Sequence, residues 1–150
     1  MQTMRKMRNA LGMMILLTAC QSAPPQVTID GAKAEMSPAI VGEAIVSLKI
    51  VNQGGADQLI GVKTDLAGST ASLHQMQGPR MVTVDTMDVP ARGAVVLKLS
   101  GSHIMVEHMA RAVKEGASLT ITLVFKKSGE KTVPLTLQKA PSLRMNQSVR

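Results

Sequence analysis

Histidine and methionine side chains gather in one short window of the sequence. All three histidines, His74, His103 and His108, lie between residues 74 and 109. Five methionines share this window, namely Met76, Met81, Met87, Met105 and Met109. A thioether sulfur is a soft, neutral donor that selects Cu(I) over harder ions such as Zn²⁺ or Mg²⁺. Imidazole adds a stronger donor, so the window predicts a Cu(I) site built from histidine and methionine.

The spacing of these residues indicates which of them would be ligands. His103 and Met105 are two residues apart, so both side chains lie on one face of an extended segment. The preceding segment is predicted to form a tight hairpin centred on Gln77-Gly78. In that register His74 lies directly across from Met81, with their Cβ atoms within about 5.5 Å. The expected donor set is His74, Met81, His103 and Met105, arranged roughly as a tetrahedron.

Taken one at a time, each of these side chains has a simpler interpretation, as a core residue or as an exposed surface residue that binds no metal. Phe125 is the only aromatic residue, so Val, Ile, Leu and Met must fill the core. We expect Met87 and Met109 to pack there and His108 to be an exposed loop residue. Met76 lies on the same face as His74 and is expected to be at most a spare donor.

The elements that position these groups are predicted to be strands, because hydrophobic periodicity near two recurs and periodicity near 3.6 does not. Pro134 indicates an edge strand or a bulge. Seven to nine short strands separated by turns predict an all-β, Greek-key β-sandwich, a single domain over residues 27–138, with at most a helical turn at 109–114. The clearest strands are expected at residues 44–51, 58–63, 94–99, 118–126 and 131–137, with the hairpin at 73–84.

The first twenty residues have the pattern of a lipoprotein signal. A basic start is followed by an apolar run at residues 10–17, which is far shorter than the roughly 20 residues that span a bilayer. Leu17-Thr18-Ala19-Cys20 then resembles a lipobox. We expect a signal peptide at 1–19, lipidation of Cys20, a tether to residue 26 and a flexible tail at 139–150. The lipid would anchor the protein in the periplasm, at the outer membrane in preference to the inner one, because of Ser22 shortly after the cysteine.

Cys20 is the only cysteine, which excludes several chemistries. A lipidated Cys20 leaves no thiol for a disulfide, a redox pair, a zinc–thiolate cluster or a blue-copper site.

Without residues 1–19 the chain keeps 14 basic and 10 acidic side chains, which are scattered. Because Trp and Tyr are absent, bases have nothing to stack on, and nucleic acid is not expected as a partner. No Gly-x-Ser-x-Gly motif occurs, and we expect no enzyme.

The window resembles the periplasmic copper chaperone family PCuAC, whose motif is H-x10-M-x21-H-x-M. Met81 and His103 are separated by 21 residues, and Met105 completes the final H-x-M. Segments 52–57, 88–93 and 113–125 are also similar to that family. The resemblance covers residues 27–137 and implies a cupredoxin-like fold. It also implies delivery of Cu(I) to a copper-accepting envelope protein, such as cytochrome c oxidase.

One feature departs from the family motif. His74 and Met81 are separated by six residues instead of ten. Four residues lost at a hairpin tip remove two from each strand, so we expect the cross-strand partners and their faces to be unchanged.

The alternative function is that of a β-sandwich lipoprotein without metal, which binds another envelope protein through a sheet face.

Overall fold

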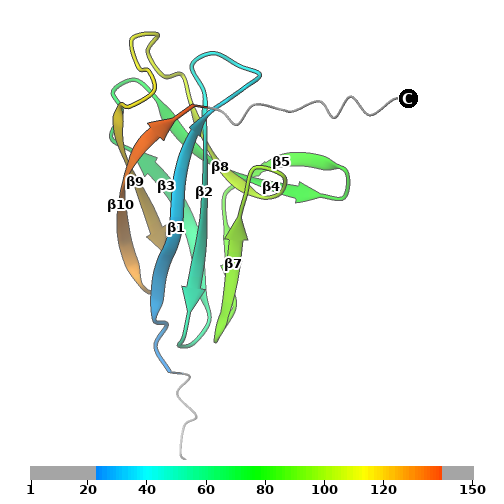
Figure 1. Cartoon of the computed structure of the whole chain (residues 1–150). Helices are drawn as coiled ribbons and strands as arrows, with labels where there is room; N and C mark the ends of the chain where they lie inside the picture. Colours follow the sequence, from blue (N-terminus) through cyan, green and yellow to red (C-terminus); the bar gives the residue numbers. More distant parts are fainter. Residues whose placement is uncertain (1–22, 140–150) are drawn as a thin grey trace, which may run out of the picture.

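The computed structural model describes residues 23–139, which form ten β-strands (Figure 1). The strands are β1 (Val27–Met36), β2 (Ala44–Asn52), β3 (Asp57–Thr64), β4 (Thr70–Gln77), β5 (Arg80–Val84), β6 (Met87–Val89), β7 (Gly93–Leu97), β8 (His103–Glu107), β9 (Ser118–Phe125) and β10 (Gly129–Gln138). Within this described part no helix occurs, so none is long enough to cross a bilayer. The expected helical turn at 109–114 is a turn in which the Val113 N–H donates to the Ala110 carbonyl at 2.9 Å. The predicted signal peptide, Cys20 and residues 140–150 lie outside the described residues.

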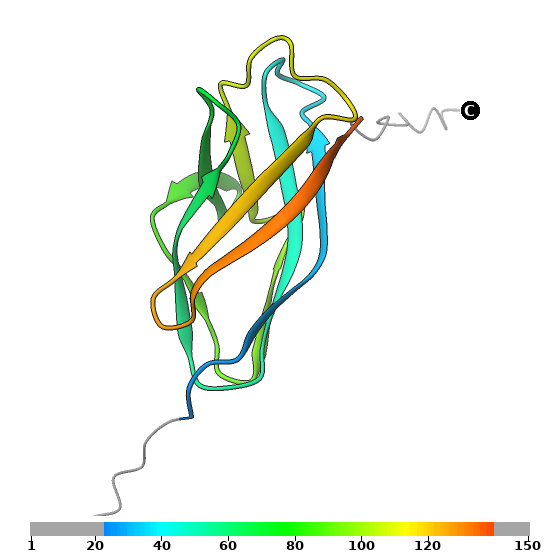
Figure 2. The same ribbon diagram turned by 90° about the vertical axis from the view of Figure 1, so that its left-hand side faces the viewer.

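The strands form two layers that are joined along one edge. One layer has the order β5-β4-β8-β2-β1, with β7 pairing the second half of β2, and the other has the order β10-β9-β3-β6. A short parallel pairing, Ala34 with Leu137 and Glu35 with Gln138, joins β1 to β10. Figure 2 shows the β9–β10 hairpin beside β1 along this edge. The chain crosses repeatedly between the layers, and the predicted all-β Greek-key sandwich is confirmed.

The core lies between the layers and is almost entirely aliphatic. In β9 the alternating residues Leu119, Ile121, Leu123 and Phe125 are buried, as their pattern predicts. In β2 the buried set includes Val46, Leu48 and Ile50. Each such side chain contributes about 1.5–3 kcal/mol when it is fully buried. This core fixes the strands, and it therefore fixes which side chains of β4, β5 and β8 point outward.

Pro134 lies where a sheet tolerates a missing donor. It pairs with Thr120 of β9, whereas β10 contacts β1 in register only at Leu137 and Gln138. On its second side this part of β10 is therefore a free edge, where the missing N–H of proline removes no ladder hydrogen bond. The predicted edge position of Pro134 is confirmed.

Asp57 ties the β9–β10 turn to the start of β3. Its carboxylate accepts hydrogen bonds from the backbone N–H groups of Gln58, Lys127 and Ser128, and from the Ser128 hydroxyl at 2.6 Å. Burial alone would raise the pKa of this carboxyl. The hydrogen bonds outweigh burial and leave the pKa of Asp57 below its usual value.

Asn52 holds the N-terminal segment against the far end of β2. Its side chain is buried, and its Oδ1 accepts from the Gln26 and Gly54 N–H groups, both at 3.0 Å. The Gly55 N–H also donates to the Pro24 carbonyl at 3.2 Å. A Cβ at Gly54 would lie 2.0 Å from that carbonyl oxygen, so only glycine permits this approach. The chain therefore joins the domain at a fixed place.

Candidate metal centre

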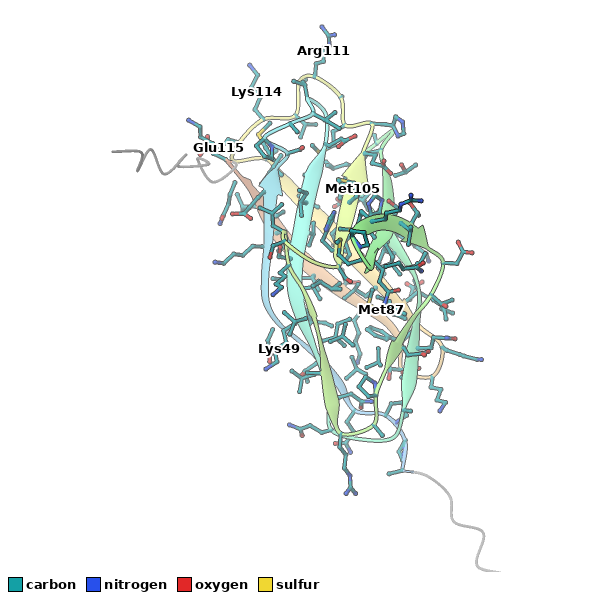
Figure 3. All side chains as sticks on the ribbon, turned by 90° about the vertical axis from the view of Figure 1, so that its right-hand side faces the viewer. Lys49, Met87, Met105, Arg111, Lys114 and Glu115 are labelled. Carbon is teal, nitrogen blue, oxygen red and sulfur yellow. The ribbon has the colours of Figure 1, made fainter. Side chains whose placement is uncertain are left out.

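Alternation along β4 and β8 places imidazole and thioether groups on one face of the sheet. Residues two apart on a strand share a face, and so do residues directly opposite on neighbouring strands. In the β4–β8 pairing His74 lies opposite His103, and Ser72 lies opposite Met105. Figure 3 views the molecule from this side, with Met105 labelled on β8. The two imidazole rings are neighbours, with centroids 5.4 Å apart and planes inclined by 37°.

The predicted register of the β4–β5 hairpin is wrong. His74 pairs with Thr83, and Met81 pairs with Met76. The turn is Gly78-Pro79: Gly78 takes a φ of +62°, which glycine permits, and proline suits the negative φ of the second position. The observed register differs from the predicted one by two residues, so each side chain of β5 stays on its predicted face of the sheet. Met81 is then a diagonal neighbour of His74 and not its direct partner. All four predicted ligands therefore lie on one face.

His103 is a buried histidine with one nitrogen left free. The side chain is 5% exposed, and its Nδ1 donates to the Gly101 carbonyl at 2.9 Å, which fixes the proton on that nitrogen. Among the described residues, the Nε2 of His103 is the only buried side-chain nitrogen or oxygen without a hydrogen-bond partner. Histidines that bind metal ions have this arrangement, in which a carbonyl orients one ring nitrogen and the other has no partner within the protein.

His74 is half-buried, and its environment favours the neutral ring. Its Nε2 lies 3.1 Å from the Ser72 hydroxyl and 3.4 Å from that of Thr83. Burial and, to a smaller extent, the His103 ring lower the pKa of His74 below its usual value. The carboxylates of Glu107 and Glu43 oppose that shift. A neutral imidazole keeps a lone pair that can bind a metal ion.

Exposure of the donors increases from β8 toward β5. His103 is buried, Met105 and His74 are half-buried, and Met81 is 38% exposed. We call the face that carries His74, Met81, His103 and Met105 the donor face. It is buried at His103 and exposed to solvent at the β4–β5 hairpin. Such an arrangement can hold a soft ion at its closed end and leave a side open to another molecule.

Met87, Met109 and His108 have the roles that the sequence predicts for them, in the core or in an exposed loop. Met87 and Met109 are each 6% exposed and belong to the core. His108 is exposed, adopts a φ of +61°, and its Nδ1 lies 3.4 Å from the Thr70 hydroxyl. Over residues 23–139 no group of three or more His, Cys, Asp or Glu side chains is placed to hold a metal ion.

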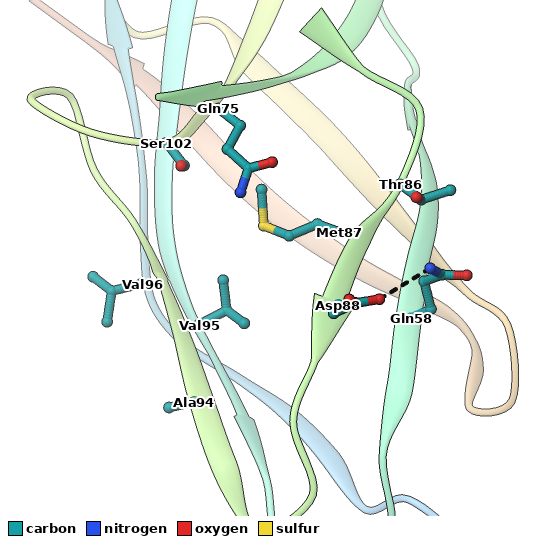
Figure 4. A pocket seen from close by; sticks show the side chains of 9 residues that line it. All are labelled: Gln58, Gln75, Thr86, Met87, Asp88, Ala94, Val95, Val96 and Ser102. Carbon is teal, nitrogen blue, oxygen red and sulfur yellow. Dashed lines mark hydrogen bonds between the residues drawn. The ribbon is translucent and has the colours of Figure 1, made fainter. Parts of the chain in front are cut away.

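A cavity of about 430 Å³ lies on the opposite side of β4 from the donor face (Figure 4). Gln75 lines it, and by alternation Gln75 points away from His74 and Met76. Polar and apolar groups mix in its wall, where the Gln58 amide donates to Asp88 at 3.0 Å. None of the four predicted ligands lines the cavity, so it is separate from the donor face.

Sequence reasoning missed the groups that orient the donors. The Ser72 hydroxyl donates to Glu107 at 3.1 Å and contacts His74, which links these three side chains. The i, i+2 spacing of Ser72 and His74 was a usable signal, because it predicts a shared face. The Gly101 carbonyl had no signal, since its contact with His103 depends on the loop conformation before β8.

Residues 27–137 match the family model described as lipoprotein LpqE-like. This match spans the two-layer domain from the start of β1 almost to the end of β10. No curated protein sequence matches the chain significantly.

Several solved structures share the fold. The copper-bound PCuAC domain from PmoF2 superposes with a TM-score of 0.63 at 23% identity, over 76% of this chain and 93% of that one. The solution structure of apo-DR1885 from Deinococcus radiodurans gives a TM-score of 0.56 at 23% identity, over 93% and 96%. CuI-DR1885 from the same organism gives 0.55 at 25% identity, over 83% of each chain. The resemblance to PCuAC domains that the sequence predicts is confirmed.

Proposed function

The chain belongs to the LpqE-like lipoprotein family, and we propose that it binds Cu(I) on the donor face and transfers the ion to another protein. The ligands are His74, Met81, His103 and Met105. The observation that carries the proposal is the free, buried Nε2 of His103, with a second imidazole beside it. Two imidazoles and two thioethers form a donor set suited to a soft monovalent ion.

The structural neighbours support this assignment. The PmoF2 domain is copper-bound, and DR1885 has been solved with Cu(I). This chain has the same fold and carries imidazole and thioether groups together on one face. Cu(I) is the cargo here, so the protein acts as a carrier and not as an enzyme.

We expect the donors on β8 to hold the ion and the donor on β5 to be exchanged first during transfer. His103 and Met105 lie on β8, a strand between β4 and β2, and this pairing positions them before the ion arrives. Met81 lies on the outermost strand and is exposed. A recipient's ligands can replace Met81 first, while His103 still holds the ion. The recipient is a copper-accepting protein of the envelope, such as cytochrome c oxidase.

The protein is held at a membrane through its N-terminus. Signal peptide 1–19 is removed, and Cys20 carries the lipid, in agreement with a lipoprotein family. A lipid anchor with more than one chain binds membranes stably. The location is the periplasmic side of the envelope, at the outer membrane.

Titration with Cu(I) against a chromogenic chelator tests the function. We expect the wild type to bind one Cu(I) per chain and His103→Ala to lose this binding. His108→Ala is the matched control, because His108 is exposed and lies outside the donor face. Unchanged Cu(I) affinity in a folded His103→Ala variant contradicts the proposal and favours the alternative, a lipoprotein that binds a partner protein without metal.

A further inference from the structure

Met76 and Met81 are placed unlike the other methionines of residues 23–139. They are 41% and 38% exposed, whereas the remaining ones are buried or half-buried. An apolar side chain left in water forgoes the stabilisation that burial gives, about 25 cal/mol for each Å². Core packing therefore does not account for this pair, although it accounts for Met87 and Met109.

The two side chains face each other across the hairpin. Met76 and Met81 are directly paired, and only the pair Gln77–Arg80 lies between them and the Gly78-Pro79 turn. Directly opposed residues have Cβ atoms about 4.5–5.5 Å apart, and methionine reaches further through three rotatable bonds. Both sulfurs can therefore approach one ion from the two strands.

His74 connects this pair to the closed end of the site. It lies two residues from Met76 on β4, and it is the diagonal neighbour of Met81 on β5. On its other side it lies opposite His103. The donors thus form a continuous row from the buried His103 to the exposed pair, without an intervening group of another kind on β4.

We propose that Met76 is a fifth Cu(I) donor, which forms with Met81 an interchangeable thioether pair at the open end of the site. This inference rests on the proposed function and adds a ligand to it. The register explains why a second sulfur is useful, because Met81 is only a diagonal neighbour of His74, and Met76 lies two residues from His74 along β4. With two thioethers, the ion can exchange one outer ligand for another while His74 holds it.

Methionine-methyl NMR of the protein, with Cu(I) added stepwise under reducing conditions, tests this directly. We expect the methyl signals of Met76, Met81 and Met105 to shift together, while those of Met87 and Met109 stay in place. An unmoved Met76 signal beside shifted Met81 and Met105 signals would overturn the inference and leave the proposed function intact. If no methionine signal shifts, both fail.

A double-mutant cycle gives a second test with a different readout. Leucine preserves size, so Met76→Leu and Met81→Leu change the sulfur and little else. We expect each single variant to retain most of the Cu(I) affinity and the double variant to lose much more than the sum of the two. Met87→Leu is the control and should bind as the wild type. A double variant identical to Met81→Leu alone would remove Met76 from the site.

Discussion

At the scale of single residues, the donors differ in what holds them. The proton of His103 is fixed by the Gly101 carbonyl, and this leaves Nε2 buried without a hydrogen-bond partner. A buried polar atom without a partner costs about 1–3 kcal/mol. A metal ion bound at this nitrogen, as we propose, would remove that cost. Met105 is less buried than the core methionines Met87 and Met109, in agreement with the proposal that it is a ligand.

Met105 and Met87 should respond in opposite ways to truncation. Met87→Ala leaves a cavity in the core and should lower the free energy of unfolding by about 2–5 kcal/mol, with unchanged Cu(I) affinity. Met105→Ala should cost less stability and weaken Cu(I) binding strongly. Chemical denaturation and chelator competition measure the two effects. Equal loss of stability in both variants, with Cu(I) affinity retained in Met105→Ala, would make Met105 a packing residue.

At the scale of elements, the β4–β5 hairpin sets the open end of the site. Its tip is the Gly78-Pro79 turn, and its register places Thr83, not Met81, opposite His74. The hairpin projects from the sandwich beside β8 (Figure 1). Within its sheet the hairpin pairs only with β8, and β5 has no further strand beyond it, so we expect the turn to help position the exposed donors.

Gly78→Ala should loosen this hairpin. The added methyl meets no atom within 4 Å, so its whole effect comes from the φ of +62° that alanine must adopt. A left-handed residue with a side chain costs about 1–2 kcal/mol. We expect faster hydrogen exchange of β5 amides and weaker Cu(I) binding, with β9 unaffected. Unchanged exchange in β5 would show that the turn does not control the hairpin.

The sequence was informative where alternation decides the outcome and uninformative where turn geometry does. The strand over 118–125 and its buried face followed from period two. The edge position of Pro134 followed from its missing N–H. The hairpin register failed because placing the turn at Gln77-Gly78 ignored Pro79, which suits the second turn position. Because the observed register differs from the predicted one by an even number of residues, the four predicted ligands still lie on one face of the sheet.

Asp57→Asn should destabilise the β9–β10 turn and change the acid response. The loss of its charged hydrogen bonds should cost about 1–3 kcal/mol at neutral pH. Because folding lowers the pKa of Asp57, its contribution is present above the unfolded value of 3.8 and is lost as the pH falls through the folded pKa. Denaturation at several pH values should therefore give a flatter acid profile for the variant. Parallel profiles would contradict this.

At the scale of the whole molecule, the two ends of β2 have different tasks. Ile45 pairs with Met105 beside the donor face, whereas Asn52 binds Gln26 where the chain joins the domain. Seven residues of strand separate these points, roughly 23 Å at about 3.3 Å each. The N-terminal connection therefore lies at one end of the sandwich and the donor face toward the other.

Cys20→Ser should separate anchoring from metal binding. We expect the wild type in the membrane fraction and the variant in the soluble fraction, because only the thiol can carry the lipid. Cu(I) affinity should be equal in the two proteins, since the chain joins the domain at Gln26, away from the donor face. Fractionation and chelator competition test this, and a membrane-bound Cys20→Ser variant would contradict the anchor.

X-ray absorption at the copper edge of the Cu(I)-loaded protein tests the proposed ligands. We expect a coordination shell that contains both imidazole nitrogen and thioether sulfur, and we expect His103→Ala to lose the ion. A coordination shell without sulfur, or Cu(I) retained with an unchanged spectrum in His103→Ala, would contradict the proposal.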